Sequence, residues 1–151
     1  MHPSTGSTDL HQDRVYAMWD RLAEFSAGEG DAALNFLLAG LCAMFAAHNV
    51  LWAVVVRLPS AASNDPLLGW RPRLVRLLRP TPAVAASVQE QFDELWSTDV
   101  DVSQVLAVSG DELFRVRLLF ETLPPEWFEG EHYRRDYLDV GHADSMSMRY
   151  A

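Results

Sequence analysis

Residues 41–58, LCAMFAAHNVLWAVVVRL, decide whether this chain has a membrane-spanning helix or a buried helix followed by a strand. The part before His48 is made of Leu, Cys, Ala, Met and Phe, whereas the part after Asn49 is rich in valine, so helix formers give way to strand formers. The surrounding residues 32–56 carry no formal charge and are long enough to span a bilayer. The polar break and the change of composition favour a buried helix over 32–47 followed by a central strand over 50–58.

Length and composition are those of one globular domain. The chain has 151 residues, of which 49% are hydrophobic and 22% charged. The formal net charge is −9 and there is no lysine. Because phosphate contacts need clustered positive charge, we expect no nucleic-acid binding by this chain. The single cysteine cannot form an intrachain disulfide, and the N-terminus lacks a signal-peptide pattern. We therefore expect a cytoplasmic protein that does not span a membrane.

The N-terminal region, residues 8–47, is predicted to form two helices after a disordered segment 1–7. Ser7, Thr8 and Asp9 offer capping oxygens for the first helix, and Gly28 and Gly30 end it. An apolar stripe follows its helical repeat and consists of Val15, Met18, Trp19, Leu22 and Phe25. Such a stripe packs either on its own domain or on a second copy. We expect a C₂ homodimer formed through residues 8–27.

The rest of the chain alternates between predicted helices and strands. Thr81-Pro82 opens a helix that continues to about residue 97, and Pro124-Pro125 opens a short helix that continues to about residue 140. Residues 114–121, FRVRLLFE, alternate as a strand, with Phe114, Val116, Leu118 and Phe120 on one face. Residues 145–151, SMSMRYA, also alternate and are predicted to form a further strand. The order predicts an α+β fold, a small sheet with helices packed on its outside.

Four arginines lie within residues 65–80, DPLLGWRPRLVRLLRP, of this otherwise acidic chain. Arg73, Arg76 and Arg79 are three residues apart, with leucines between them, so the stretch is amphipathic. We expect its basic side to face water or to pair with the acidic residues of segment 90–112.

One segment has the composition of a metal site. In residues 131–144, EHYRRDYLDVGHAD, His132 and Asp136 are four apart on one helical face, and His142 follows. Polar pairs at this spacing are also ordinary on solvated helix faces, and the spacing matches no compact type of metal site. We therefore expect no metal or other cofactor, and keep a metalloprotein or metal-dependent enzyme using His132, Asp136 and His142 as the alternative.

Other catalytic chemistry has little support. Cys42 lies in an apolar helix without a neighbouring His or Arg, which indicates a buried, inert thiol. The hydrolase motif G-x-S-x-G, the glycine-rich phosphate loop and H-E-x-x-H are absent from the sequence. We expect no enzymatic activity.

Aromatic side chains are numerous enough to line a pocket for a small apolar ligand, although aromatics also fill cores. The candidates for ligand binding are Trp52, Trp70, Arg71, Phe120, Trp127, Tyr133 and Tyr137.

The run GWRPR (69–73) and the segment FRVRLLFETLPPEWFEGEHYRRDYLDVGHADSMSM (114–148) resemble the N-terminal sensor region of LuxR-type bacterial transcription regulators, in a GAF-like subgroup. The resemblance covers about residues 30–151. It implies a GAF/PAS-like α+β fold with a small antiparallel sheet flanked by helices, and N-terminal helices that dimerise. It implies a ligand-sensing or dimerisation domain of a transcription regulator, here without the helix-turn-helix part.

Overall fold

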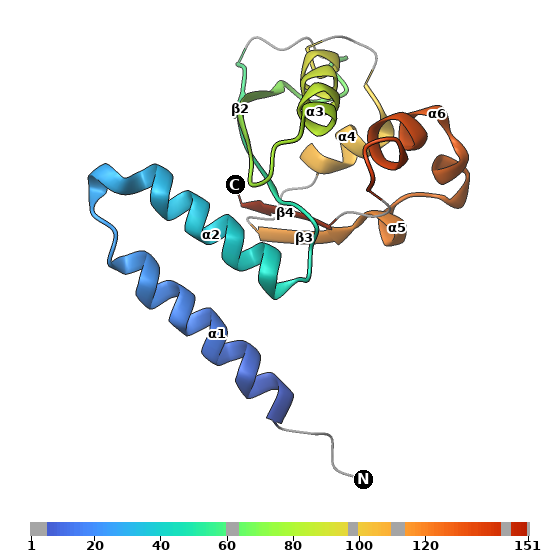
Figure 1. Cartoon of the computed structure of the whole chain (residues 1–151). Coiled ribbons are helices and arrows are strands. Elements are labelled where there is room, and N and C mark those ends of the chain that lie inside the picture. The colour runs from blue at the N-terminus through green and yellow to red at the C-terminus, as the bar shows by residue number, and fades with distance from the viewer. Residues whose placement is uncertain (1–5, 60–63, 97–99, 110–113, 143–145, 151) are drawn as a thin grey trace. The chain divides into compact units, whose positions relative to one another are not determined.

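The structure is a computed structural model that describes residues 6–59, 64–96, 100–109, 114–142 and 146–150 (Figure 1). It confirms the α+β class, since helices and short strands alternate along the chain. The chain divides into two compact units. Unit 1 comprises Met1–Trp52 with Arg76–Arg79, and unit 2 comprises Ala53–Val75 with Pro80–Ala151.

Unit 1 is built on two helices, α1 (Gly6–Ala23) and α2 (Gly30–Met44), joined by the short 3₁₀ helix η1 (Ala27–Glu29). The helices come close at Gly40, where an added Cβ would lie 2.9 Å from the Met18 sulfur. The rings of Phe25 and Phe36 are 5.9 Å apart. The helix expected over 32–47 is therefore present and ends slightly earlier. Of the segment 1–7 expected to be disordered, residues 1–5 lie outside the described part, and Gly6 and Ser7 belong to α1.

The predicted stripe of α1 does not behave as one surface. Its members Val15, Met18, Leu22 and Phe25 are half-buried, whereas Trp19 is 61% exposed. Tyr16 is also exposed, and its hydroxyl accepts a hydrogen bond from Gln12. Within unit 1, most of the stripe is thus covered, and the large apolar residues that α1 leaves exposed are Leu10, Tyr16 and Trp19.

Two strands, β1 (Leu51–Arg57) and β2 (Trp70–Leu77), pair into one sheet. The turn before β2 is organised by Asp65, whose carboxylate accepts hydrogen bonds from the backbone N–H groups of Leu67 and Gly69 and lies 3.1 Å from Arg71. Gly69 has φ +85°, a conformation that glycine adopts without steric cost. Burial raises the pKa of Asp65, but these hydrogen bonds and the Arg71 charge outweigh it and hold that pKa below its usual value.

The arginines of this stretch mostly have local roles. Arg71 binds Asp65, and Arg79 donates to the carbonyl of His48. Arg76 pairs with Asp31, at 3.0 Å, whereas the sequence predicted either solvent or the acidic residues of segment 90–112 as its surroundings. Arg73 is exposed to solvent. The stretch forms the strand β2, whose alternation puts Arg76 on the face opposite Arg71 and Arg73, so it has no single basic side.

Unit 2 contains the remaining elements. They are α3 (Pro82–Glu94), α4 (Val102–Val108), β3 (Phe114–Leu118), α5 (Leu119–Thr122), η2 (Pro125–Glu129), α6 (Glu131–Tyr133), the π-helical segment η3 (Arg134–Leu138) and β4 (Met146–Tyr150). Thr81 caps α3 as predicted, accepting a hydrogen bond from the Val84 N–H. The hydrophobic core consists of Leu123, Trp127 and Tyr133. Partly buried side chains pack against it, namely Leu106, Leu119, Phe128 and Tyr137.

The strand β3 pairs antiparallel with β4, in register Val116↔Met148, and ends at Leu118, where α5 begins, although the sequence predicted a strand as far as Glu121. Val116 is 47% exposed, while Arg115 and Arg117 are half-buried. The reason is that both guanidinium groups are drawn to backbone carbonyls at the end of α4. The described strands form two separate pairs, β1 with β2 and β3 with β4.

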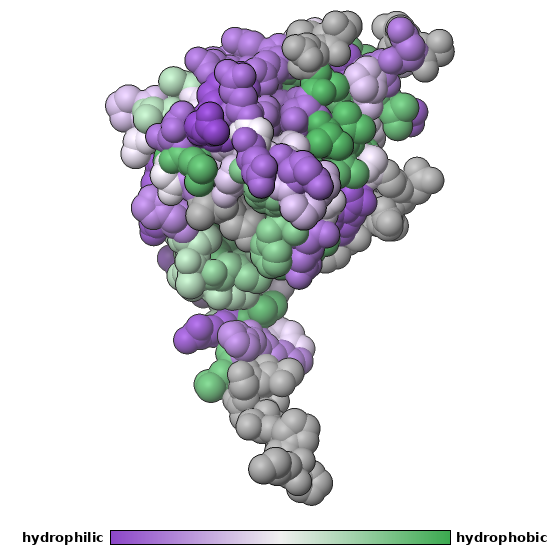
Figure 2. Space-filling view, turned by 90° about the vertical axis from the view of Figure 1, so that its right-hand side faces the viewer, coloured by the Kyte–Doolittle hydropathy of each residue, from purple (hydrophilic) through white to green (hydrophobic). Residues whose placement is uncertain are grey.

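The described surface is mixed in character. Figure 2 shows one face, on which hydrophobic residues form separate groups among hydrophilic ones. Within the described residues, no helix combines the length and the apolar character needed to cross a bilayer. Cys42 is buried, as predicted, and its thiol donates to the Ala47 carbonyl.

Candidate functional site

A cavity of about 180 Å³ lies within unit 2. Its walls come from α3, α4, β3, α5 and η3. The lining residues are Gln91, Ser103, Gln104, Leu106, Ala107, Arg117, Leu118, Leu119, Thr122, Leu123 and Tyr137. Aliphatic side chains and one tyrosine make up its apolar part, beside a few polar groups. A mostly apolar hollow with a small number of placed polar groups is the usual form of a small-molecule site.

Gln104 is the polar residue with the most constrained geometry in this lining. It occupies the third position of α4, and its Oε1 accepts a hydrogen bond of 2.9 Å from the backbone N–H of Asp101. This capping box fixes which end of the amide is oxygen, because only oxygen can accept that N–H. The Nε2 group is therefore the free end. It is buried and has no hydrogen-bond partner among the described residues.

Arginines from β3 hold the other end of α4. Arg117 Nη1 donates to the Leu106 carbonyl at 3.0 Å, and Arg115 Nη2 donates to the carbonyls of Leu106 and Ala107. The last carbonyls of a helix lack intrahelical partners and carry partial negative charge, so cations bind there favourably. These bonds place Arg117 in the cavity wall.

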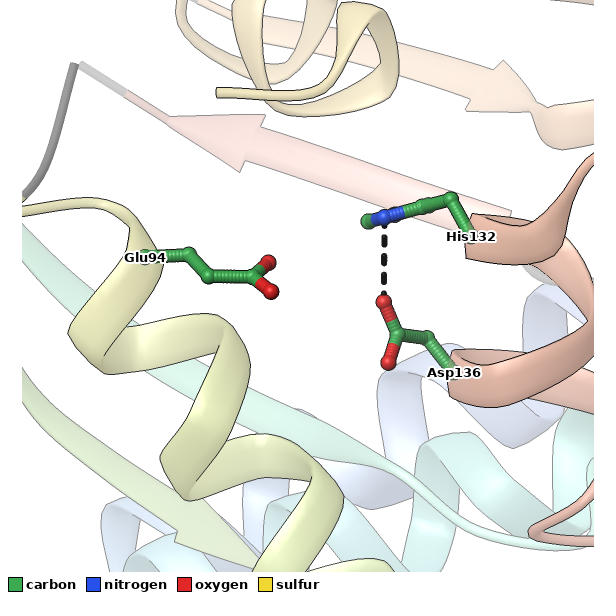
Figure 3. A group of neighbouring side chains, drawn as sticks. All are labelled: Glu94, His132 and Asp136. Atoms are coloured by element: carbon green, nitrogen blue, oxygen red, sulfur yellow. Dashed lines mark ion pairs between the residues drawn. The ribbon is translucent and has the colours of Figure 1, made fainter. Parts of the chain in front are cut away.

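A cluster of ionisable side chains also lies in unit 2. Figure 3 shows Glu94 of α3 pointing toward His132 and Asp136. His132 Nδ1 lies 3.1 Å from Asp136 Oδ2, as the four-residue spacing predicts. Glu94, His132 and Asp136 each offer one ligand atom, and these atoms lie within 4.8 Å of one another. The structure thus brings the predicted pair together, but the third member is Glu94 rather than His142.

Arg135 neutralises much of this cluster. Its Nε and Nη2 contact both oxygens of Asp136, at 2.7 and 2.8 Å, and Nη2 also lies 2.7 Å from Glu94. The hydrogen bond to Asp136 raises the pKa of Arg135, so the guanidinium stays charged. The Asp136 side chain is 0% exposed. In this arrangement a guanidinium holds the carboxylate oxygens that a metal ion would need.

Asp101 connects the cluster to the cavity. Its carboxylate lies 3.7 Å from His132 Nε2 and accepts hydrogen bonds from Trp127 Nε1 and from the Ser103 N–H. Burial raises the pKa of Asp101, but the bonds from Ser103 and Trp127 and the charge of His132 outweigh it, so that this pKa lies below its usual value. The same residue, through its own N–H, orients Gln104. Asp101, at the start of α4, thus contacts His132 of the cluster through its carboxylate and holds Gln104 of the cavity lining through its backbone N–H.

The residues expected to bind a ligand are dispersed. Tyr137 lines the cavity, while Trp127 and Tyr133 belong to the core beside it. Phe120 is 56% exposed on α5. The others lie outside the cavity lining: Trp52 is in β1, and Trp70 and Arg71 are in β2.

Four polar residues of the site were missed at the sequence level: Glu94, Asp101, Gln104 and Arg117. The sequence held a signal for two of them. Asp101 and Gln104 have the D-x-x-Q spacing of a capping box just before an apolar run, which would have predicted α4. Nothing local marks Glu94 or Arg117, whose partners lie far along the chain.

Comparison with known proteins adds no relative, since no family model, no curated protein and no solved structure matches the chain.

Proposed function

We propose that this protein is a non-enzymatic sensor domain that binds a small molecule in the cavity of unit 2. The observation that carries the proposal is the cavity itself, in which mostly aliphatic walls meet a few polar groups. Such a hollow can cover the apolar body of a small molecule while its polar groups orient it.

The polar groups of the cavity support binding rather than catalysis. The serine and threonine hydroxyl groups of the lining have other partners: the Ser103 side chain bonds Asp101, and Thr122 donates to the Leu118 carbonyl. In these described contacts each hydroxyl meets a carboxylate or a carbonyl, and a nucleophilic hydroxyl is usually activated by an imidazole or another general base. The resemblance to regulator sensor regions supports a role in transcription control, in the cytoplasm, as a homodimer.

The test is ligand-dependent stabilisation of the whole chain, measured by thermal unfolding with a panel of small aromatic and aliphatic compounds. At least one compound should raise the melting temperature, because it binds only the folded state. In Leu106→Phe the added ring fills the cavity and should abolish that shift. Leu138→Phe, at an exposed position outside the lining, should keep it. A panel without any stabilising compound would overturn the proposal.

A metal centre is the second candidate function, favoured by the closeness of Glu94, His132 and Asp136. Binding requires the ion to displace Arg135 from Asp136. Metal analysis of the purified protein and titration with Zn²⁺ test it. Stoichiometric metal that is lost in His132→Ala but kept in His142→Ala supports this centre, and metal-free protein that does not bind Zn²⁺ rejects it.

A further inference from the structure

We infer that α4 is the switch element of this sensor domain: it opens as one unit away from the rest of unit 2, and a molecule in the cavity holds it closed. This inference deepens the proposed sensor function and rests on it. Three features carry it: the packing of α4, the bonds at its two ends and the buried amide of Gln104.

Packing holds α4 only weakly. All seven of its residues are described, and none of them is buried. Val102 is 45% exposed, and Leu106 packs against the hydrophobic core as a partly buried side chain. By contrast, α3 buries Val84 and Ser87. Segments with few buried apolar contacts open at a lower free-energy cost than the whole fold does.

Polar contacts hold the two ends of α4 instead. At the start, the Asp101 carboxylate accepts hydrogen bonds from Trp127 of the core. At the end, Arg115 and Arg117 of β3 donate to the last carbonyls of the helix and to the residue that follows it. Because these are bonds from side chains, they can release without breaking the pairing of β3 with β4. The start of α4 is thus its fixed end, and the arginine pair holds the end that can release.

Closing α4 has a cost at Gln104. Its Oε1 accepts the Asp101 N–H, so Nε2 is the donor end, and Nε2 is buried without a hydrogen-bond partner among the described residues. A buried donor without a partner is unfavourable relative to one that water reaches. Opening of α4 exposes Nε2 to water and removes this cost. The cost therefore brings the closed and the open positions closer in free energy.

The cavity couples α4 to a bound molecule. Four of the lining residues belong to α4, namely Ser103, Gln104, Leu106 and Ala107. A molecule in the cavity contacts these residues only when α4 is closed, and it therefore shifts the equilibrium toward the closed position. Ordering of a segment is a common form of regulatory switch.

The experiment is amide hydrogen exchange of the whole chain, followed by nuclear magnetic resonance at low urea concentrations. The reporters for α4 are the amides of Val105 and Ser109, which bond to the carbonyls of Asp101 and Val105. After correction for intrinsic rates, we expect both to exchange about tenfold or more faster than the Ser87 amide in the middle of α3, with little dependence on urea. Ser87 should instead follow global unfolding. The inference is overturned if all three amides share one free energy of opening and one urea dependence.

A second measurement adds a probe to the same chain. The probe is the compound that raises the melting temperature most in the panel, which includes toluene, p-cresol and 1-hexanol. At about ten times its Kd, exchange at Val105 and Ser109 should slow about tenfold. Unchanged exchange at these two amides would refute the switch and leave the binding site in place. If no compound of the panel stabilises the protein, the proposed function fails and the switch fails with it.

Removal of one arginine tests whether α4 opens as a unit. Arg115→Met keeps the hydrocarbon stem but loses the donors to α4, and Arg115 is not among the described lining residues. Exchange at Val105 and at Ser109 should become about tenfold faster, while Ser87 should keep its rate. Arg134→Met removes the same charge at an exposed position and should leave all three rates unchanged. Faster exchange at Ser109 alone would mean that only the end of the helix frays, and would contradict opening as one unit.

Discussion

Trp127 Nε1 donates to both carboxylate oxygens of Asp101, at 3.0 and 3.1 Å, across 26 residues of sequence. The indole belongs to the core of unit 2, and the carboxylate caps α4. The bond therefore ties the helix that carries Gln104 to the hydrophobic core of the unit. Asp101 also contacts His132. This one residue therefore connects the core, the ionisable cluster and, through Gln104, the cavity wall.

Removing this bond should destabilise the protein. Trp127→Phe keeps an aromatic ring in the core but deletes the donor and some buried area, and we expect a loss of about 2–3 kcal/mol in the free energy of unfolding. Urea denaturation measures it. Trp96→Phe is the matched control, because Trp96 is 49% exposed, and it should change stability by less than about 0.5 kcal/mol. Equal effects of both substitutions would show that the buried bond contributes nothing.

The buried carboxylate of Asp136 should be essential for the stability of unit 2. Asp136→Asn removes the charge that holds Arg135 and His132, and we expect the free energy of unfolding to fall by about 2–3 kcal/mol. This is less than the usual loss for a fully buried ion pair, because the Arg135 side chain is partly exposed. Urea denaturation again provides the measurement. Asp139→Asn, at an exposed position three residues on, should be nearly neutral. A neutral Asp136→Asn would contradict the described network.

Acid should weaken the fold through Asp101 and Asp65, whose pKa values are lowered in the folded state. A lowered carboxyl pKa stabilises the folded state above the unfolded pKa, about 3.9, and this contribution is lost as the pH falls through the folded pKa. The urea midpoint of the unmodified chain should therefore exceed that of Asp101→Asn by a constant amount above about pH 5, and the difference should shrink below about pH 4. A difference that grows in acid would reverse the assigned sign.

The exposed part of α1 gives the clearest test of the proposed homodimer. Trp19 and Tyr16 are the large apolar residues that α1 leaves open at its centre, so Trp19→Asp should dissociate the dimer without disturbing the contact of Met18 with Gly40. Sedimentation of both proteins at micromolar concentration measures this. Leu10→Asp, at the exposed N-terminal end of α1, shows how far the interface extends. If the unmodified chain is already monomeric, the dimer proposal fails.

The sequence predicted what local patterns determine. The change from helix to strand formers near Asn49 gave α2 and β1, and Thr81-Pro82 gave the start of α3. The spacing of His132 and Asp136 predicted their contact. Each of these depends on residues that are close in the chain, where propensity and periodicity apply directly.

Long-range partners explain what the sequence did not predict. The alternation in β3 put Val116 and the arginines on opposite faces but did not show which face is covered, because the carbonyls at the end of α4 draw Arg115 and Arg117 to the covered side. The triplet spacing of arginines obscured β2, in which Arg76 reaches Asp31. The cavity is lined by residues that lie far apart in the chain, from Gln91 to Tyr137. No local pattern reports such relationships.

The central claim is that the cavity of unit 2 holds a small ligand, and nuclear magnetic resonance of its lining residues tests it most directly. In a titration of the whole chain with the compound that raises the melting temperature most, the backbone amide signals of Leu106 and Leu119 should shift and saturate together. The Gln12 side chain, on α1 and bonded to Tyr16, is the internal reference and should not move. Signals of Leu106 and Leu119 that stay fixed while this compound reaches millimolar concentration would contradict the account.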